Sequence, residues 1–126
     1  MINGAHILFY SAQPAADRAF FRDKIGLKSI DIGGGWLIFA LPPSEAAVHP
    51  GDENAERLHA DRPLLGAVVY LMCDDLHVEV KALAAKGVRC TDIGEESWGI
   101  KTTIPLPSGG EIGLYQPKHP TALALG

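Results

Sequence analysis

The side chains in this chain best suited to chemistry are imidazoles and carboxylates on strand-like segments. Glu45 and His49 are four residues apart, so an extended strand would place them on one face. Glu111 lies on a later apolar segment, and His6 precedes an apolar run near the start. Such nitrogen and oxygen donors suit zinc, iron, manganese or nickel. One hypothesis is therefore a metal site of His6 with Glu45 or His49, plus Glu111.

Other common catalytic and cofactor patterns are missing from the sequence. The glycine groups 33–35 and 109–110 lack the spacing of a phosphate or dinucleotide loop, and their positions predict hairpin turns. No Ser-His-Asp or Cys-His arrangement stands out. Cys73 and Cys90 belong to no close-spaced metal or redox motif, and their apolar surroundings predict reduced core residues.

Length and composition predict one compact domain in the cytoplasm. The chain has 126 residues, of which 47% are hydrophobic and 21% charged, values typical of a globular protein. The net charge of −4 gives no basic surface, which argues against nucleic acid and anionic membranes as partners. No apolar run approaches the ~20 residues that span a bilayer. The first residues also lack the layout of a signal peptide.

A short pattern occurs twice in the chain and indicates an internal repeat. A glycine is followed by Asp-Ile-Gly and then by a tryptophan, at nearly constant spacing, with one residue inserted before the second tryptophan. The paired positions are Gly26 with Gly87, Asp31–Gly33 with Asp92–Gly94, and Trp36 with Trp98. In each copy an apolar strand and an amphipathic segment precede the pattern. Such a repeat predicts two similar modules that face each other.

The predicted elements give each module the order βαβββ. In the first module they are a strand at 5–10, a helix at 15–25, and strands at 27–32, 36–41 and 44–49. In the second they are a strand at 67–73, a helix from 76 to 86, and strands at 88–93, 99–104 and 111–116. The polar segment 50–63 is interpreted as a mobile connection. The domain is thus divided into module one (1–49), a linker (50–65), module two (66–117) and a tail (118–126).

Taken together, these features resemble the vicinal oxygen chelate superfamily. The resemblance rests on the two βαβββ modules, His6 on a first strand, Trp98-Gly99 before a Gly-rich turn, and the closing Leu-Tyr-Gln-Pro at 114–117. That superfamily includes glyoxalase I, extradiol dioxygenases, fosfomycin-resistance enzymes and bleomycin-resistance proteins. The resemblance implies an α+β fold in which one cupped, eight-strand sheet surrounds a pocket. It also implies helices on the outer side of the sheet and a homodimer.

The same resemblance implies where metal ligands should stand. Enzymes of this kind hold a divalent metal with His and Glu side chains from the first and last strands of the modules, and the metal stabilises developing oxyanion charge. His6 matches one position. Its repeat counterpart is Val68 or Ala67, and the position usually held by Glu on the closing strand is Gly113. Two expected ligands are missing, so a metal site would need relocated ligands such as His49 and Glu111.

The leading hypothesis is a cytoplasmic homodimer that binds a small organic molecule without a catalytic metal, as bleomycin-resistance proteins do. Gly113 would leave room for a ligand near the backbone, while Trp36 and Trp98 could be pocket walls or could simply pack at turns. His6 could likewise line the pocket, bind a metal or pack in the core. The predicted pocket consists of His6, Leu8, Trp36, Tyr70, Met72, Trp98, Gly113 and Tyr115.

Two other hypotheses remain open. The first is a metal-dependent lyase, isomerase or dioxygenase that uses His6, His49 and Glu111. The second is a regulatory or structural dimer with a vestigial pocket. The sequence therefore leaves open whether the protein is an enzyme.

Overall fold

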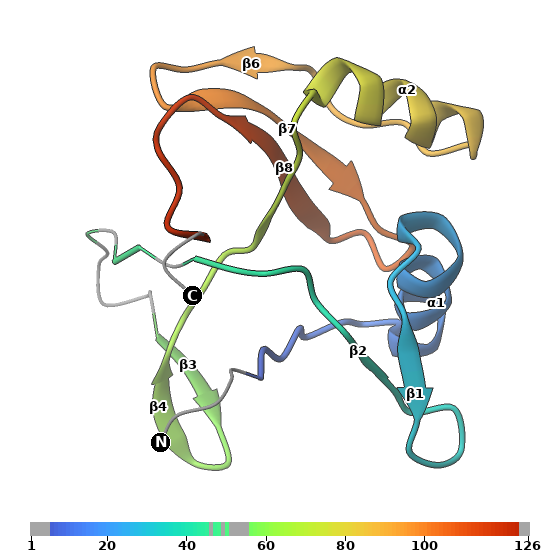
Figure 1. Cartoon of the computed structure of the whole chain (residues 1–126). Helices are drawn as coiled ribbons and strands as arrows, with labels where there is room; N and C mark the ends of the chain where they lie inside the picture. Colours follow the sequence, from blue (N-terminus) through green and yellow to red (C-terminus); the bar gives the residue numbers. More distant parts are fainter. Residues whose placement is uncertain (1–5, 46, 49, 51–55, 124–126) are drawn as a thin grey trace.

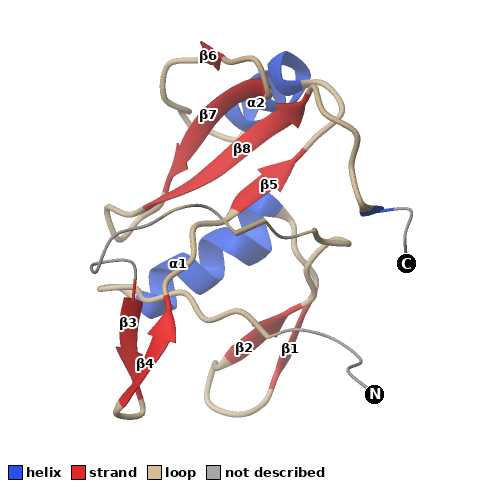
Figure 2. Ribbon diagram, turned by 90° about the vertical axis from the view of Figure 1, so that its left-hand side faces the viewer, coloured by secondary structure: helices blue, strands red, loops and turns tan. Residues whose placement is uncertain are grey.

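A computed structural model describes residues 6–45, 47–48, 50 and 56–123. The architecture is mixed α+β, with three sheets and two main helices (Figure 1). The largest sheet has the order β5-β8-β7-β6, and two separate hairpins lie at the other end of the molecule (Figure 2). The strands of the large sheet are β5 (Tyr70–Met72), β6 (Gly94–Glu95), β7 (Gly99–Pro105) and β8 (Glu111–Pro117).

The helix α2 (Leu76–Ala85) covers one face of the large sheet. Asp75 begins it, because the Asp75 side chain accepts a hydrogen bond from the Val78 amide at 3.2 Å. Leu76 is fully buried and Ile104 on β7 is 1% exposed. The core around these two side chains contains Phe21, Leu83, Val88, Ile112 and Leu114. Alternation along β7 and β8 therefore leaves their other residues on the face away from α2.

The helix α1 (Pro14–Phe20) continues into one π-helical turn, η1 (Phe21–Ile25), and Gly26 ends it at φ 84°. Buried Asp17 accepts a hydrogen bond from the Ser108 amide at 3.1 Å, which ties α1 to the β7–β8 turn. The two helix ends are also joined directly. Lys24 Nζ donates to the Lys86 carbonyl at 3.0 Å, and Lys86 Nζ donates to the Lys24 carbonyl at 3.1 Å. We call this reciprocal pair the lysine clasp.

The single eight-strand sheet expected from the resemblance does not form among the described residues. Strands β1 (Ser29–Asp31) and β2 (Leu37–Phe39) make a separate hairpin. The strand predicted at 5–10 is also wrong where it is described, because residues 6–10 pair with no strand and are exposed. The apolar pattern there indicates only that the segment is hydrophobic. A β-strand also needs the edge of a partner strand with which to pair. The division into tandem modules remains a prediction.

The polar segment before residue 66 contains more structure than predicted. Strands β3 (Glu56–His59) and β4 (Arg62–Leu65) form an antiparallel hairpin. Its turn places Ala60 and Asp61 at φ 51° and 59°. Such left-handed positions usually carry Gly, Asn or Asp, so Ala60 is unusual there and the turn has only a weak sequence signal. The interpretation of this stretch as an unfolded connection is wrong from residue 56 onward.

Both cysteines are free thiols and half-buried, which agrees with the predicted role as reduced residues near the core. Burial raises the pKa of the Cys73 thiol to about 11, and the nearby carboxylates of Glu79, Asp74 and Asp75 add to the shift. No helix within the described ranges is long and apolar enough to cross a membrane. The cytoplasmic location stays a prediction.

Candidate functional site

Three aromatic rings gather on the face of the large sheet that is turned away from α2. They come from Tyr70 on β5, Tyr115 on β8, and Trp98 just before β7. Their ring centroids lie 5.5 to 6.2 Å apart, with interplanar angles of 72° to 88°. Each pair is therefore an edge-to-face contact, the arrangement that aromatic quadrupoles favour. We call these residues the aromatic triad.

Two glycines create the space that the triad occupies. Tyr70 stands opposite Gly113 in the β5–β8 pair. A Cβ atom on Gly113 would lie 2.6 Å from Tyr70 Cε1 and 2.7 Å from Tyr70 Cγ. A Cβ on Gly99 would lie 3.1 Å from Tyr115 Cδ2 and 2.7 Å from the Gln116 carbonyl oxygen. Gly113 was expected to leave room for a ligand near the backbone, but the Tyr70 ring fills that space.

Tyr115 is hydrogen-bonded to a histidine in the tail. His119 Nδ1 lies 2.8 Å from the Pro120 carbonyl oxygen, which can only accept, so Nδ1 carries the proton. In the neutral ring Nε2 is then an acceptor, and the Tyr115 hydroxyl donates to it at 3.2 Å. Burial raises the pKa of Tyr115, and the charge of Glu45 adds to the effect. The Tyr115 hydroxyl is thus neutral, and its oxygen can still accept a hydrogen bond from a ligand.

A cation borders the triad. Lys101 faces Tyr115 across the β7–β8 pair, and its Nζ lies 5.5 Å from the centroid of the Trp98 ring. The same Nζ is 3.4 Å from a carboxylate oxygen of Glu96. Because Lys101 and Glu96 are both well exposed, this ion pair is weak and the ammonium group can change partners. The site therefore offers aromatic surface, one mobile positive charge and one phenolic oxygen.

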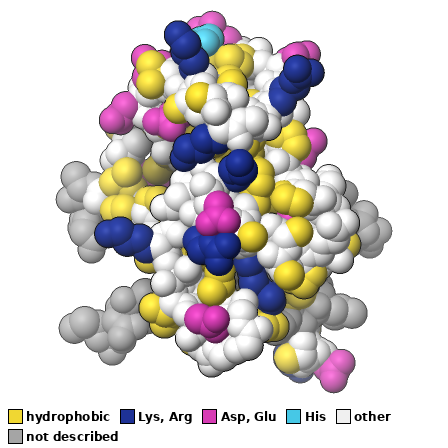
Figure 3. Space-filling view, turned by 90° about the vertical axis from the view of Figure 1, so that its right-hand side faces the viewer, with side chains coloured by type: hydrophobic (Ala, Val, Ile, Leu, Met, Phe, Trp, Pro, Cys, Tyr) yellow, Lys and Arg dark blue, Asp and Glu magenta, His cyan; other side chains and the backbone are white. Residues whose placement is uncertain are grey.

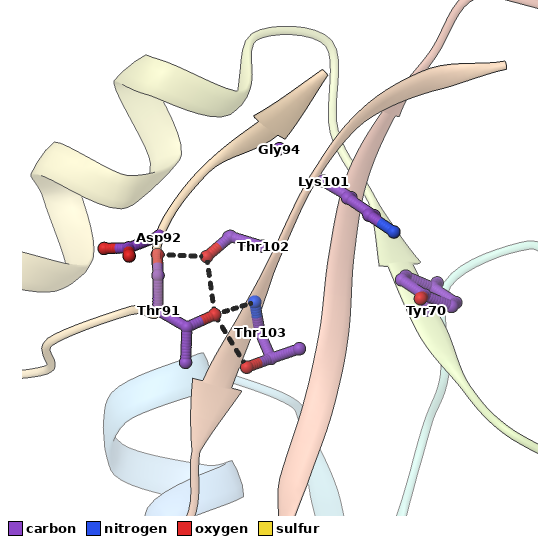
Figure 4. Close-up of a pocket in the computed structure, with 7 residues that line it drawn as sticks. All are labelled: Tyr70, Thr91, Asp92, Gly94, Lys101, Thr102 and Thr103. Carbon is purple, nitrogen blue, oxygen red and sulfur yellow. Dashed lines mark hydrogen bonds between the residues drawn. The ribbon is translucent and has the colours of Figure 1, made fainter. Parts of the chain in front are cut away.

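A small pocket beside the triad is built from threonines (Figure 4). It measures about 180 Å³, which is below the size of most sites for drug-sized ligands. Thr91 Oγ1 lies 2.9 Å from Thr103 Oγ1, and the Thr102 hydroxyl donates to the Thr91 carbonyl at 2.6 Å. The Thr103 hydroxyl donates to Glu111 Oε1 at 2.8 Å. These groups satisfy one another, so the pocket is mainly a structural network.

The proposed metal ligands that the structure describes, His6, Glu45 and Glu111, form no common group. Glu111 is held by Thr103, and Glu45 accepts a hydrogen bond from the Ala122 amide at 2.6 Å. His6 is exposed, and His49 lies outside the described residues. In the described parts of the chain, no three His, Cys, Asp or Glu side chains form a group that could hold a metal ion. Whether the protein binds a metal stays a prediction.

The structure divides the predicted pocket residues into two sets. Five of them share one area of the large sheet, with Met72 opposite Tyr115 in the register: Tyr70, Met72, Trp98, Gly113 and Tyr115. Three lie elsewhere. His6 and Leu8 belong to the segment 6–10, which forms no described strand, and Trp36 is 56% exposed beneath the Arg18 guanidinium, 4.4 Å from its ring centroid.

Lys101 and His119 were not predicted as site residues. Lys101 lies on the same face as Tyr115 by strand alternation, so a register between β7 and β8 would have found it. His119 carries no such signal, because its position depends on the path of the tail. The Lys118 amide donates to the Trp98 carbonyl at 2.9 Å and Lys118 Nζ pairs with Glu95 at 2.7 Å, which brings His119 to Tyr115.

Solved structures share this fold, although no protein-family model and no curated protein sequence matches the chain. TnmS3, an antibiotic binding protein from Streptomyces sp. CB03234, is 18% identical with a TM-score of 0.59 over 94% of this chain and 100% of its own. Lactoylglutathione lyase from Agrobacterium tumefaciens is 20% identical with a TM-score of 0.55, over 86% and 88% of the two chains. A glyoxalase/bleomycin resistance protein from Streptomyces sp. CB03234 is 23% identical with a TM-score of 0.52, over 84% and 92%.

These matches show that the chain shares the fold of these proteins, as the resemblance implied. They include both a binding protein and a lyase by name. One fold supports both kinds of activity, so function must be argued from the residues of the site.

Proposed function

We propose that the aromatic triad binds a small, flat organic molecule and that this binding needs no metal ion. Tyr70 and Trp98 each remain 39% exposed although their rings contact one another, so ring surface is available to a ligand. Aromatic side chains with a few polar groups are the usual lining of small-molecule sites. The fold match to a protein named as antibiotic binding supports a binding role.

The observation that carries the proposal is the position of the Tyr70 ring over Gly113. In enzymes of the superfamily, the resemblance implies a Glu ligand at this strand position. Here any side chain at 113 would collide with Tyr70, because a Cβ alone would come within 2.7 Å of the ring. The other missing ligand position, Val68, is apolar and 86% exposed. Aromatic surface thus stands where the superfamily's enzymes place metal chemistry.

The polar groups at the rim suggest the kind of ligand. A ring that stacks on Trp98 would bring its substituents near Lys101, whose ammonium group lies 5.5 Å from that ring. A phenolate, carboxylate or carbonyl oxygen on the ligand would be a suitable partner for this charge. The Tyr115 oxygen would accept from a hydroxyl or amide of the ligand, since its own proton is directed to His119. A flat ring with adjacent oxygen substituents meets all three requirements.

Thermal-shift screening tests the proposal directly. We expect at least one flat aromatic antibiotic or catechol to raise Tm, because a ligand at ~100 times its Kd adds about 2.7 kcal/mol of stability. The rise should be the same for protein treated with EDTA and for untreated protein. Thiol adducts of 2-oxo compounds, the substrates expected of a glyoxalase, serve as the comparison set. If no compound in the panel moves Tm, the pocket is vestigial and the proposal is wrong.

Metal analysis separates this proposal from the metal-dependent alternative. Protein purified without chelators should contain no stoichiometric divalent metal. A lyase, isomerase or dioxygenase that uses His6, His49 and Glu111 would instead hold one ion per chain and lose it in His6→Ala and Glu111→Ala. That result would establish the alternative and reject binding without a metal.

We also propose that the protein is a homodimer whose interface includes the β1–β2 hairpin. A two-stranded hairpin is marginal on its own, and this one exposes Ile30 at 65% and Ile32 at 60%. Phe9 and Trp36 add further exposed apolar surface from the same half of the chain. Exposed apolar surface commonly marks a protein interface.

Analytical ultracentrifugation tests the dimer. The unmodified chain should sediment as a dimer, and Ile30→Glu should sediment as a monomer because it places a charge on the proposed interface. Val78→Glu is the matched control, since Val78 is similarly exposed but lies on α2. A monomeric unmodified chain, or equal effects of the two substitutions, would reject this interface.

A further inference from the structure

A second and larger cavity lies away from the aromatic triad. It is an open groove of about 620 Å³ between the ends of the two helices and the β7–β8 turn. Its apolar surface comes from Phe20 on α1 and from Leu106 with its two flanking prolines, and the buried Val88 forms part of its floor. The volume is within the range of sites for small organic ligands. The groove thus has the size and the apolar surface of a ligand site that is separate from the triad.

The rim of this groove is positively charged in a protein of net charge −4. Lys24, Lys86 and Arg89 line it, and no Asp or Glu of the described residues does. The nearest acidic neighbour in sequence, Asp23, is paired with Arg22 at 2.7 Å. Figure 3 looks onto this side of the molecule and shows Lys and Arg side chains near the centre of the face, with hydrophobic atoms and an acidic side chain among them. The groove therefore favours anions.

The lysine clasp offsets the negative partial charge of the helix C-termini at this groove. Helix C-termini point carbonyl oxygens outward and carry partial negative charge, which would repel an anion. Here the ammonium groups of Lys24 and Lys86 donate to the terminal carbonyls of the opposite helix, so that partial charge is balanced. The clasp also holds both ammonium groups in place. Arg89 has no hydrogen-bond or ion-pair partner among the described residues, and its guanidinium is available to a carboxylate.

We propose that this groove binds an amphipathic organic carboxylate. The apolar body would lie on Phe20 and Leu106, and the carboxylate would pair with Arg89 between the two lysines. The proposal does not depend on the ligand of the aromatic triad. It assigns the protein a second ligand site, at the junction between the first helix and the second half of the chain.

Titration of the full chain with octanoate, followed by amide resonances in NMR spectra, tests the proposal. We expect saturable shifts at Gly87, Val88 and Leu106, with little change at Tyr115. Octanol should bind more weakly, since it keeps the apolar body and lacks the charge, and acetate should not saturate. Arg89→Gln should weaken octanoate about five- to tenfold, as expected for a partly exposed charged pair. Lys81→Gln, the same charge change on exposed α2, should leave the affinity unchanged.

Several results would overturn the proposal. Octanol binding as tightly as octanoate would show that the cations play no part. If Arg89→Gln and the unmodified protein bind octanoate with equal affinity and have the same melting curve, Arg89 does not contribute to binding. Saturable shifts confined to the triad would place the carboxylate in the other site. Binding of an acidic peptide but not of octanoate would make the groove a protein interface.

Discussion

Gly113→Ala is expected to destabilise the protein by about 1–3 kcal/mol, as overpacking usually does. The substitution adds only a methyl group, and glycine to alanine inside a strand is normally neutral or stabilising. Here the new Cβ would lie 2.7 Å from Tyr70 Cγ, an atom close to the Tyr70 backbone. The ring cannot avoid it by a small movement of its tip and must change rotamer. Tyr70 would then lose its edge-to-face contacts with Trp98 and Tyr115.

A double-mutant cycle with Tyr70→Ala isolates this contact. When the ring is absent, Gly113→Ala should cost nothing or stabilise the protein by a few tenths of a kcal/mol, because alanine restricts the unfolded chain. Urea unfolding followed by circular dichroism gives the four free energies of unfolding. The predicted change of sign between the two backgrounds is the specific signature of a ring packed over the glycine.

Gly94→Ala is the control for the Gly113 experiment. Gly94 also lies on a strand of the large sheet, and a Cβ there would meet only the Lys101 side chain at 3.5 Å, an ordinary contact. Its substitution should change the free energy of unfolding by less than ~0.5 kcal/mol. If Gly113→Ala costs the same with and without the Tyr70 ring, the ring does not occupy that space. A Glu ligand at 113 would then be sterically possible.

Most of the second half of the chain was predictable because its local signals agree with one another; the exception is the strand predicted at 88–93, since the described strand β6 is Gly94–Glu95 instead. The helix predicted from 76 to 86 is α2, and its apolar residues Leu76 and Leu83 are buried. The strands predicted at 99–104 and 111–116 are β7 and β8, within one residue at their ends. Alternation along these strands then placed Tyr115 and Gly113 together. Where propensity, periodicity and caps point to the same structure, sequence arguments are reliable.

The first half was less predictable because strand pairing is a long-range property. The apolar run at 6–10 resembles a strand, yet it pairs with no described strand. Conversely, β3–β4 mixes charged and apolar residues without a strand pattern, and its Ala60–Asp61 turn has only a weak sequence signal. The repeat also suggested that Trp36 and Trp98 have equivalent roles. The structure places Trp36 against Arg18 and Trp98 in the triad.

The site was only partly predictable for a related reason. Residues on one strand face could be grouped by alternation, which does not depend on contacts made elsewhere. The pairing of Tyr115 with His119 depends instead on the tail, which is fixed by the contacts of Lys118 and of the Ala122 amide with distant residues. The filling of the space over Gly113 depends on the rotamer of Tyr70. Neither follows from spacing along the chain.

Trp98→Ala is expected to weaken the ligand of the triad about 10- to 100-fold, the range for an aromatic residue at the centre of a binding site. Trp36→Ala should leave the affinity unchanged, although the two residues are repeat counterparts. The comparison is informative because both changes remove the same side chain from a turn of the same sequence pattern. Affinity would be measured with the flat aromatic compound that raises Tm most in the screen.

Fluorescence makes the same comparison while keeping an aromatic ring at both positions. It can do so because the chain contains only two tryptophans, so each can be observed alone when the other is replaced by Phe. In Trp36→Phe, Trp98 is the remaining tryptophan, and its emission should change on titration because the ligand stacks on its ring. In Trp98→Phe, the emission of Trp36 should stay constant under the same titration. Equal responses from the two proteins, or a response from Trp36 alone, would move the ligand away from the triad. The ligand site would then have to be sought at residues 6–10 and at the β1–β2 hairpin, since these contain the other predicted pocket residues, His6, Leu8 and Trp36.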